Sequence, residues 1–286
     1  MADRWLKQTG YPVVSAEAVY NAEKECAEIS VSQKIPGGNL PWIFPFTGRL
    51  INEEGVVVAK FMEKVDTEKK MFIVPCPGPF AFTIWNPNHA AYLKMDLTSS
   101  EDELYLHLRY NSDLVTRFLM HCTLFEREMV KLCRDESAEV SKRLVDEFMN
   151  ELSNHAEMDS VGALGLTLFE SVNDPEFAHS YTKLYHAKQR FMSAVAANNS
   201  GILKALLGAY TRSPAKTGLP SELARTFKAR SVKNLILRLL ATLDTPEIHT
   251  LLKERYENAV CSTDRMNAFS LYLSSSAPDR MEMLNR

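Results

Sequence analysis

The sequence predicts two domains, a small antiparallel β-sandwich followed by an all-helical, α-solenoid-like domain. Three observations lead to this fold class. Apolar residues alternate with a period of two in the first third of the chain and recur with a helical period after Leu97. All three tryptophans and eight of the 13 prolines precede residue 88. The length of 286 residues suits about two domains, which we expect at 1–97 and 98–286.

The first domain is expected to contain six or seven strands at roughly ten-residue spacing, the pattern of a small sandwich. Asn52 to Gly55 predicts a turn between two of them, and Gly37-Gly38 predicts a hairpin turn rather than an anion-binding loop. The expected strands begin at Val13-Val14 and continue with Ala27–Ile35, Phe44–Leu50, Val56–Val58, Met71–Val74, Phe80–Ile84 and Ala91–Leu97.

The segment from Met71 to Leu93 contains no Asp, Glu, Lys or Arg and could be mistaken for a membrane span. Four prolines and two asparagines interrupt it, and these would break a helix and bring polar groups into lipid. We therefore interpret it as two buried strands around a proline-rich corner, with no membrane as partner.

The second domain shows helix starts and amphipathic stripes. Ser99 and Ser100 precede Asp102 and Glu103 at capping-box spacing, and Asn111-Ser112-Asp113 is expected to cap a helix that runs toward Leu132. Thr245-Pro246 marks a further helix start. Helices of 12 to 20 residues with short loops predict a stack of antiparallel helix pairs. The clearest stripe consists of Val232, Leu235, Ile236, Leu239, Leu240 and Leu243.

The C-terminal end is expected to be a truncated helical stack. Thr263 is predicted to cap a helix whose Met266, Phe269 and Leu273 form one apolar stripe. Met281 and Leu284 would then need a neighbouring helix to cover them. We expect residues 263–286 to be the helical segment least protected from hydrogen exchange.

Net charge and cysteine spacing give information about binding partners and cellular compartment. The net charge of −3 gives no reason to expect nucleic acid or an anionic membrane as partner. The five cysteines are scattered and form no CxxC pair, so neither a disulfide framework nor a zinc ribbon is indicated. Reduced thiols, and a first 20 residues without an apolar signal core, favour a cytoplasmic protein.

No catalytic, cofactor-binding or metal-binding residues are predicted. None of the seven histidines begins an HExxH motif, and the sequence has no GxSxG or phosphate-binding loop. Glu176 and His179 occur once, whereas a di-metal carboxylate site needs that spacing twice. His121-Cys122 and Cys133 point in different directions around a helix.

The sequence resembles a known family at several collinear positions. Arg4 to Val13 contains the Trp, Gln, Gly and Pro-Val that lead into the β-sandwich of zinc aminopeptidases of the aminopeptidase N family. Gln33 ends the first long strand as in that family, and Pro45 to Gly55 resembles the hairpin of its bacterial-type branch.

The resemblance continues in the helical part. Ser112-Asp113 with Arg117-Phe118 resembles the family's Asp-Ser-Asp…Arg-Trp-Glu, although Phe118 and Leu119 replace Trp and Glu. Arg230 to Asn234 and Ser262 to Ala268 resemble two helix starts, Arg-x-Leu-x-Asn and Met-Thr-Asp-Arg…Ala-Leu. Residues 60–97 and 135–220 match only in pattern.

The resemblance implies a non-catalytic C-terminal portion of such an enzyme. The family's zinc helix and its Gly-x-Met-Glu-Asn motif, which holds the substrate's free amine, are missing from this sequence. Zinc, peptide substrates and an upstream catalytic domain would then belong to the parent protein. In the family, the sandwich bridges to a helical domain that covers the active site.

Two other functions stay open. The chain could work alone as an interaction scaffold of a sandwich and helical repeats, and coding sequence for HExxH upstream of Met1 would decide against this. A carbohydrate-binding module would need Trp42 and Trp85 exposed on one sheet face, whereas aromatic residues of a small sandwich usually form its core.

Overall fold

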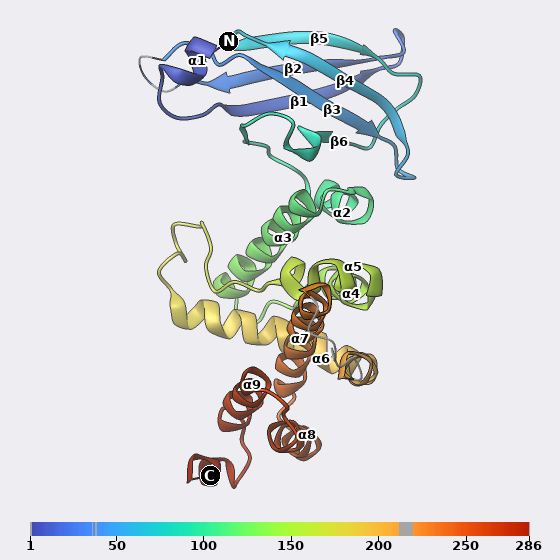
Figure 1. Ribbon diagram of the computed structural model, residues 1–286. Coiled ribbons are helices and arrows are strands. Elements are labelled where there is room, and N and C mark those ends of the chain that lie inside the picture. The colour runs from blue at the N-terminus through green and yellow to red at the C-terminus, as the bar shows by residue number, and fades with distance from the viewer. Residues whose placement is uncertain (1, 36, 38, 212–219, 286) are drawn as a thin grey trace. The chain divides into compact units, whose positions relative to one another are not determined.

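A computed structural model describes residues 2–35, 37, 39–211 and 220–285 (Figure 1). A region of strands is followed by a region of helices, so the predicted fold class is confirmed. The contacts within the chain define two compact units, Met1–Met120 and His121–Arg286. The predicted domain boundary at residues 97/98 stays a prediction, and the last strand ends at Met95 while the next helix begins at Glu101.

The strands form two sheets with the orders β5-β2-β1-β7 and β4-β3-β6. All neighbours pair antiparallel, as the predicted sandwich requires, except β1 and β7, which pair in parallel over two residues at the edge of one sheet. The strand expected at Ala91–Leu97 has only two residues. The strands are β1 Val13–Asn21, β2 Cys26–Lys34, β3 Phe44–Ile51, β4 Val57–Val65, β5 Lys69–Pro75, β6 Phe82–Trp85 and β7 Lys94–Met95.

The inner faces of the two sheets share one hydrophobic core. Ile29 and Val31 of β2 are buried in it together with Phe44, Phe46 and Leu50 of β3, as the alternation of apolar residues predicts. Burial of apolar area at about 25 cal/mol per Å² makes this core the main source of stability for the sandwich.

Gly48 is required by close packing in this core. A Cβ atom on Gly48 would lie 2.2 Å from the ring of Phe61, which itself packs edge-on against Trp85. The predicted turn after β3 is also present, because the Asn52 side chain accepts a hydrogen bond from the Val56 N–H (2.8 Å) and Gly55 has a φ of +81°. Of the turn predicted at Gly37-Gly38, Gly38 lies outside the described residues.

The N-terminal stretch forms a five-residue helix, α1 Ala2–Leu6, which precedes the first expected strand and was not predicted. The helix is held against the segment 39–43 before β3. The Trp5 indole N–H donates to the Ile43 carbonyl (2.8 Å), and its ring lies 4.7 Å from that of Trp42. The Arg4 guanidinium donates to the Pro41 carbonyl (2.9 Å).

Gln33 binds the same segment from the sheet side. Its buried amide donates to the Trp42 carbonyl (3.0 Å) and the Thr67 carbonyl (2.8 Å), and its oxygen accepts from the Trp42 N–H (2.8 Å). Trp42 is only 1% exposed, and the half-buried Trp85 ring stacks on Phe46. The hypothesis of a carbohydrate-binding face formed by Trp42 and Trp85 is therefore wrong.

The helices follow the strands in sequence. Their lengths fall outside the expected 12 to 20 residues at α2 with 10, α5 with seven, α3 with 21, α7 with 22 and α6 with 31. The remaining elements are the 3₁₀ turns η1 Pro87–His89, η2 Gly162–Leu166 and η3 Arg280–Asn285, and the helices α2 Glu101–Tyr110, α3 Leu114–Arg134, α4 Lys142–Ser153, α5 His155–Val161, α6 Tyr181–Thr211, α7 Pro220–Ala241, α8 Pro246–Glu257 and α9 Ser262–Leu273.

Most of the predicted helix starts are correct. The Ser100 hydroxyl accepts from the Glu103 N–H, Asp113 from the Val115 N–H, and Thr245 from the Ile248 N–H. The cap predicted at Thr263 is wrong, since α9 already begins at Ser262 with Cys261 at the cap position and without a side-chain hydrogen bond there.

The first helix after the sandwich packs on the outer face of a sheet. Leu106 and Tyr110 of α2 lie against Ile51, Phe82 and Ile84 of β3 and β6. This contact explains why β6, a short edge strand, is buried on both faces.

The helical unit has a continuous core. Phe125 of α3 and Phe148 of α4 both meet Phe191 of α6 edge-on, with ring centroids 5.2 and 5.7 Å apart. Val232 and Ile236 of α7 are fully buried, in agreement with the predicted stripe.

In α9 the buried side chains are Ala268 and Tyr272, whereas Met266 of the predicted stripe is exposed. Met281 and Leu284 are exposed, in agreement with the expectation that they need a further helix to cover them, and Met283 between them is buried. The segment after α9 is also bound to the rest of the unit, because the Ser276 N–H donates to the Asp244 carboxylate (2.9 Å). The hydrogen-exchange ranking of this segment stays a prediction.

Within the described ranges, no helix is both long enough and apolar enough to cross a membrane. The uncharged segment Met71–Leu93 instead supplies most of β5, the whole of β6 and the turns that follow them.

We predict that Gln33→Leu lowers the free energy of unfolding by about 3 kcal/mol, because it leaves both buried peptide groups of Trp42 without partners and removes the part-buried bond to the Thr67 carbonyl. Gln8→Leu is the matched control, since the Gln8 amide makes the same pair of bonds to Leu40 at an exposed site. There we expect a loss under about 1 kcal/mol. Urea unfolding followed by tryptophan fluorescence measures both, and equal losses would contradict the prediction.

Candidate functional site

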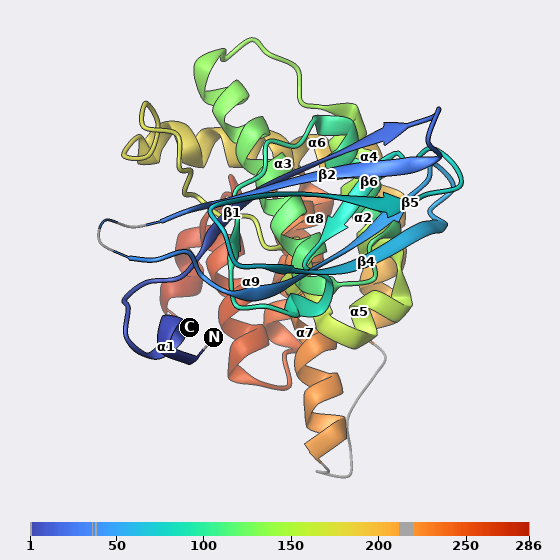
Figure 2. The same ribbon diagram turned by 90° about the horizontal axis from the view of Figure 1, so that it is seen from above.

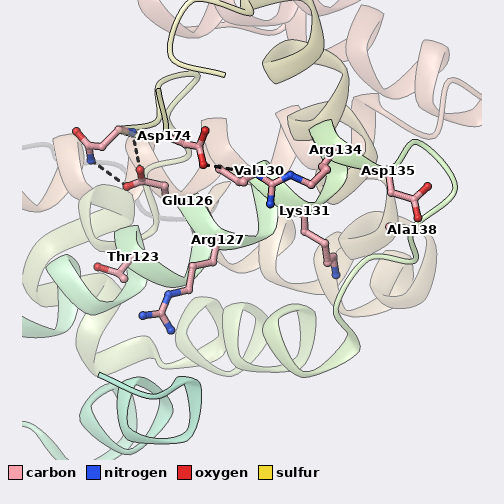
Figure 3. A pocket seen from close by; sticks show the side chains of 10 residues that line it. Thr123, Glu126, Arg127, Val130, Lys131, Arg134, Asp135, Ala138 and Asp174 are labelled. Atoms are coloured by element: carbon pink, nitrogen blue, oxygen red, sulfur yellow. Dashed lines mark hydrogen bonds and ion pairs between the residues drawn. The ribbon is translucent and has the colours of Figure 1, made fainter. Parts of the chain in front are cut away.

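The largest depression we describe is a groove of about 890 Å³ along α3 (Figure 3). One side of the groove is a single face of α3, because Thr123, Arg127, Val130 and Arg134 follow at helical spacing. The other walls come from the turn after α3 and from the segment before α6. The remaining lining residues are Glu126, Lys131, Asp135, Ala138, Asn173 and Asp174.

The charged groups of the groove are used to hold its own walls. The Glu126 carboxylate accepts hydrogen bonds from the backbone N–H and the side-chain amide of Asn173 (Figure 3). Arg134 donates to Glu176 (3.0 Å) and lies 3.7 Å from Asp174. Among the described lining residues, Thr123 supplies the only hydroxyl and no histidine or cysteine is present. The arrangement therefore fixes the segment 173–176 on α3 and offers no nucleophile beside a base.

Two histidines are buried as neutral rings. Burial lowers the pKa of His121 to about 4, and the ring stacks on Phe125 with an interplanar angle of 4°. Burial likewise lowers the pKa of His107 to about 4, and the His107 ring nitrogen faces the Asn111 side-chain amide at 3.3 Å. Both positions are typical of core histidines.

The remaining residues singled out in the sequence are not brought together. Glu176 and His179 lie in exposed turns before α6, and Glu176 binds Arg134. Burial raises the thiol pKa of Cys122 and of Cys133, which disfavours the thiolate that a metal site needs.

No zinc site can be assigned to the residues that the structure describes. Over the ranges that the structure describes, no three His, Cys, Asp or Glu side chains gather in a way that could hold a metal ion. The zinc implied by the resemblance is therefore not assigned to any residue here. The absence of catalytic residues from the chain stays a prediction.

Two of the motifs that carry the resemblance meet in the structure. Asp264 of α9 is paired with both Lys233 and Arg230 of α7, the latter at 3.4 Å. The Asp264 side chain is only 10% exposed. The Asn267 amide also donates to the Asn234 side-chain oxygen (3.3 Å). These polar residues thus join α7 to α9.

Sequence reasoning missed this pairing and the α3 groove. The stretches 230–234 and 262–268 were each recognised as helix starts, but nothing in one sequence says that they touch. The groove had a weak signal, the spacing of Arg127, Val130 and Arg134 on one face of a predicted helix.

Comparisons with known proteins concern both parts of the chain. Residues 101–286 match a family model described as "Domain of unknown function (DUF3458_C) ARM repeats". The fold is similar to that in the crystal structure of Legionella pneumophila aminopeptidase A in complex with aspartic acid, with a TM-score of 0.70 and 18% sequence identity. The likeness covers 93% of this chain and 32% of that chain, so this chain spans about a third of that relative's length. No curated protein matches the sequence.

We predict that His121 makes the helical unit lose stability as the pH falls. The folded pKa of about 4 lies below the ordinary value of 6.5, so the unfolded chain takes up a proton first. Between pH 7.5 and 5 this costs about 2 kcal/mol, and His121→Leu should remove that part of the pH dependence. Urea unfolding at both pH values measures it. The exposed His179→Gln is the control, and an equal effect there would contradict the prediction.

We also predict that Asp264→Ala lowers the free energy of unfolding by about 3 kcal/mol or more, because Arg230 and Lys233 are left as half-buried cations without a carboxylate. Replacing Lys233 by Met in the same chain should restore part of the loss. The control is Glu247→Ala, which breaks the exposed Lys204–Glu247 pair and should cost under about 1 kcal/mol. Comparable losses in both variants, measured by urea unfolding, would rule the explanation out.

Proposed function

Because the chain belongs to the DUF3458_C family of ARM-repeat domains, we propose that it is the non-catalytic C-terminal region of a larger zinc aminopeptidase. It would supply the β-sandwich and at least the first part of the helical domain. The parent enzyme would hydrolyse N-terminal amino acids from peptides.

The observation that carries this proposal is the joint match of both units to one aminopeptidase chain. A helical repeat alone or a small sandwich alone occurs in proteins of many functions. Their combination in this order, over 93% of the chain, is much more specific. The resemblance motifs support the same conclusion at residue level, from Trp5 and Gln33 in the sandwich to Asn234 and Asp264 in the helices.

In this proposal the catalytic residues lie in a domain that precedes this chain in the parent protein. Zinc and the groups that bind the substrate's free amine would lie in a catalytic domain that precedes the sandwich, and that domain would be the principal partner. The helical region would cover the active site and restrict it to peptide substrates. A cytoplasmic location fits the scattered cysteines, none of which forms a disulfide among the described residues.

The anchoring of the N-terminal stretch supports a bridging role for the sandwich. Arg4, Trp5 and Gln8 all bind backbone groups of residues 40–43, so the chain enters the sandwich along a fixed path. A domain joined at this point would be held by a bonded connection rather than by a flexible linker.

We predict that the purified chain does not hydrolyse alanyl-aminomethylcoumarin above buffer and does not retain one zinc per chain after dialysis. The physical reason is that the described residues offer no cluster of three metal ligands. Fluorimetry and metal analysis measure the two quantities. One tightly held zinc, or activity that a chelator abolishes, would overturn the proposal.

The alternative is an interaction scaffold that works without a catalytic domain. The two functions differ in the gene, since the proposed one requires HExxH and Gly-x-Met-Glu-Asn in the same reading frame upstream of Met1. A stop codon in frame immediately before Met1 would favour the scaffold.

A further inference from the structure

Helix α7 is built in two different halves. All six of its buried residues lie in the second half, from Val232 to Leu240. The first eight residues, 220–227, contain no buried side chain, and we call them the overhang. In Figure 2 this orange end of α7 extends beyond the neighbouring helices of its unit. Lys228, the next residue, lies against the body of the unit, because its Cα would be 3.1 Å from a Cβ on Gly162.

The overhang presents an apolar pair to solvent. Leu223 is 45% exposed and Phe227 is 62% exposed, and they are four residues apart on one helix face. Asn234 lies on the same face two turns later, where Asn267 of α9 covers it. The face that α9 covers along the second half of α7 is therefore continued, uncovered, by Leu223 and Phe227.

Positive charge borders this apolar pair. At 3.6 residues per turn, Arg230 and Lys228 fall on either side of Phe227, whereas Glu222 falls on the opposite side of the helix. The Arg230 guanidinium lies over the Phe227 ring, 5.7 Å from its centroid. Arg230 and Lys233 share a single carboxylate, Asp264, so this cluster has one positive charge in excess.

Most of the stability of a protein helix comes from packing of its apolar face, so a partner that covers Leu223 and Phe227 would add contacts that the overhang lacks. We propose that the face formed by Leu223, Phe227, Lys228 and Arg230 docks an acidic amphipathic segment of another protein. The segment would lay apolar side chains on Leu223 and Phe227 and carboxylates beside Lys228 and Arg230.

The chemistry of the face favours a protein segment over a lipid surface. Eight residues of helix are only about 12 Å long, and two large apolar side chains are few for an interfacial membrane helix. Apolar anchors at i and i+4 suit contact with the apolar side of an amphipathic segment, and the neighbouring cations favour a segment that carries carboxylates.

The test uses a fluorescein-labelled helical peptide of leucine and glutamate as the probe, with its glutamine counterpart as the neutral peptide. We expect saturable anisotropy with the whole chain, at least about tenfold weaker binding by the Leu223→Ser/Phe227→Ser variant, and weaker binding at high salt. The matched control is Tyr181→Ser/Tyr185→Ser, an exposed pair with the same spacing on α6, which should bind like the unchanged chain. Thermal unfolding confirms that the variants are folded.

Four results would overturn the proposal. They are no binding at millimolar probe, equal binding of the neutral peptide, an equal loss in the α6 control, and binding unaffected by Leu223→Ser/Phe227→Ser. Two further measurements address other occupants of the face. Binding to phosphatidylserine vesicles that depends on Phe227, or a dimer in sedimentation velocity that the Leu223→Ser/Phe227→Ser variant abolishes, would replace the protein segment by a membrane or by a second copy of the chain.

Discussion

One buried side-chain amide, that of Gln33, holds the segments of the sandwich together. Gln33 satisfies both peptide groups of Trp42 and reaches the Thr67 carbonyl, so it joins the end of β2 to the segment before β3 and to the turn before β5. The peptide groups of Trp42 cannot reach water, and without Gln33 they would oppose burial of the Trp42 ring. The ring in turn is the surface against which Trp5 packs. One amide thus connects the N-terminal stretch, both sheets and the core.

Hydrophobic periodicity was sufficient to predict the class of each long element. Ile29 and Val31 alternate because one sheet face is buried, and Val232, Leu235 and Ile236 recur because one helix face is buried. Periodicity does not tell which strand or helix packs against which, and the predictions that failed concern this packing. The parallel pairing of β7 with β1 and the burial of Ala268 and Tyr272 instead of Met266 are set by tertiary contacts between residues that lie far apart in sequence.

The residues that carry the family resemblance have structural roles in this chain. Gln33 and Trp5 fix a segment without regular structure, Asp113 caps α3, and Asp264 joins two helices. Such residues are recognisable across distant relatives because a buried polar group must keep its partner, whereas apolar core residues can be exchanged for others of similar volume. For the candidate site, the sequence predicted only that catalytic motifs are absent. The α3 groove could not be predicted, because Asn173 and Asp174 from another segment complete its wall.

The segment 39–43 has no regular secondary structure, yet it should resist proteases. A protease must draw an extended stretch of substrate into its active site, and here backbone carbonyls of Leu40, Pro41, Trp42 and Ile43 already accept hydrogen bonds from four different side chains. Cleavage would require these bonds to open together, so the segment is opened less often than a loop without such anchors. Nicking by trypsin or thermolysin should therefore begin at exposed turns elsewhere, and the sandwich should remain as a stable limit fragment.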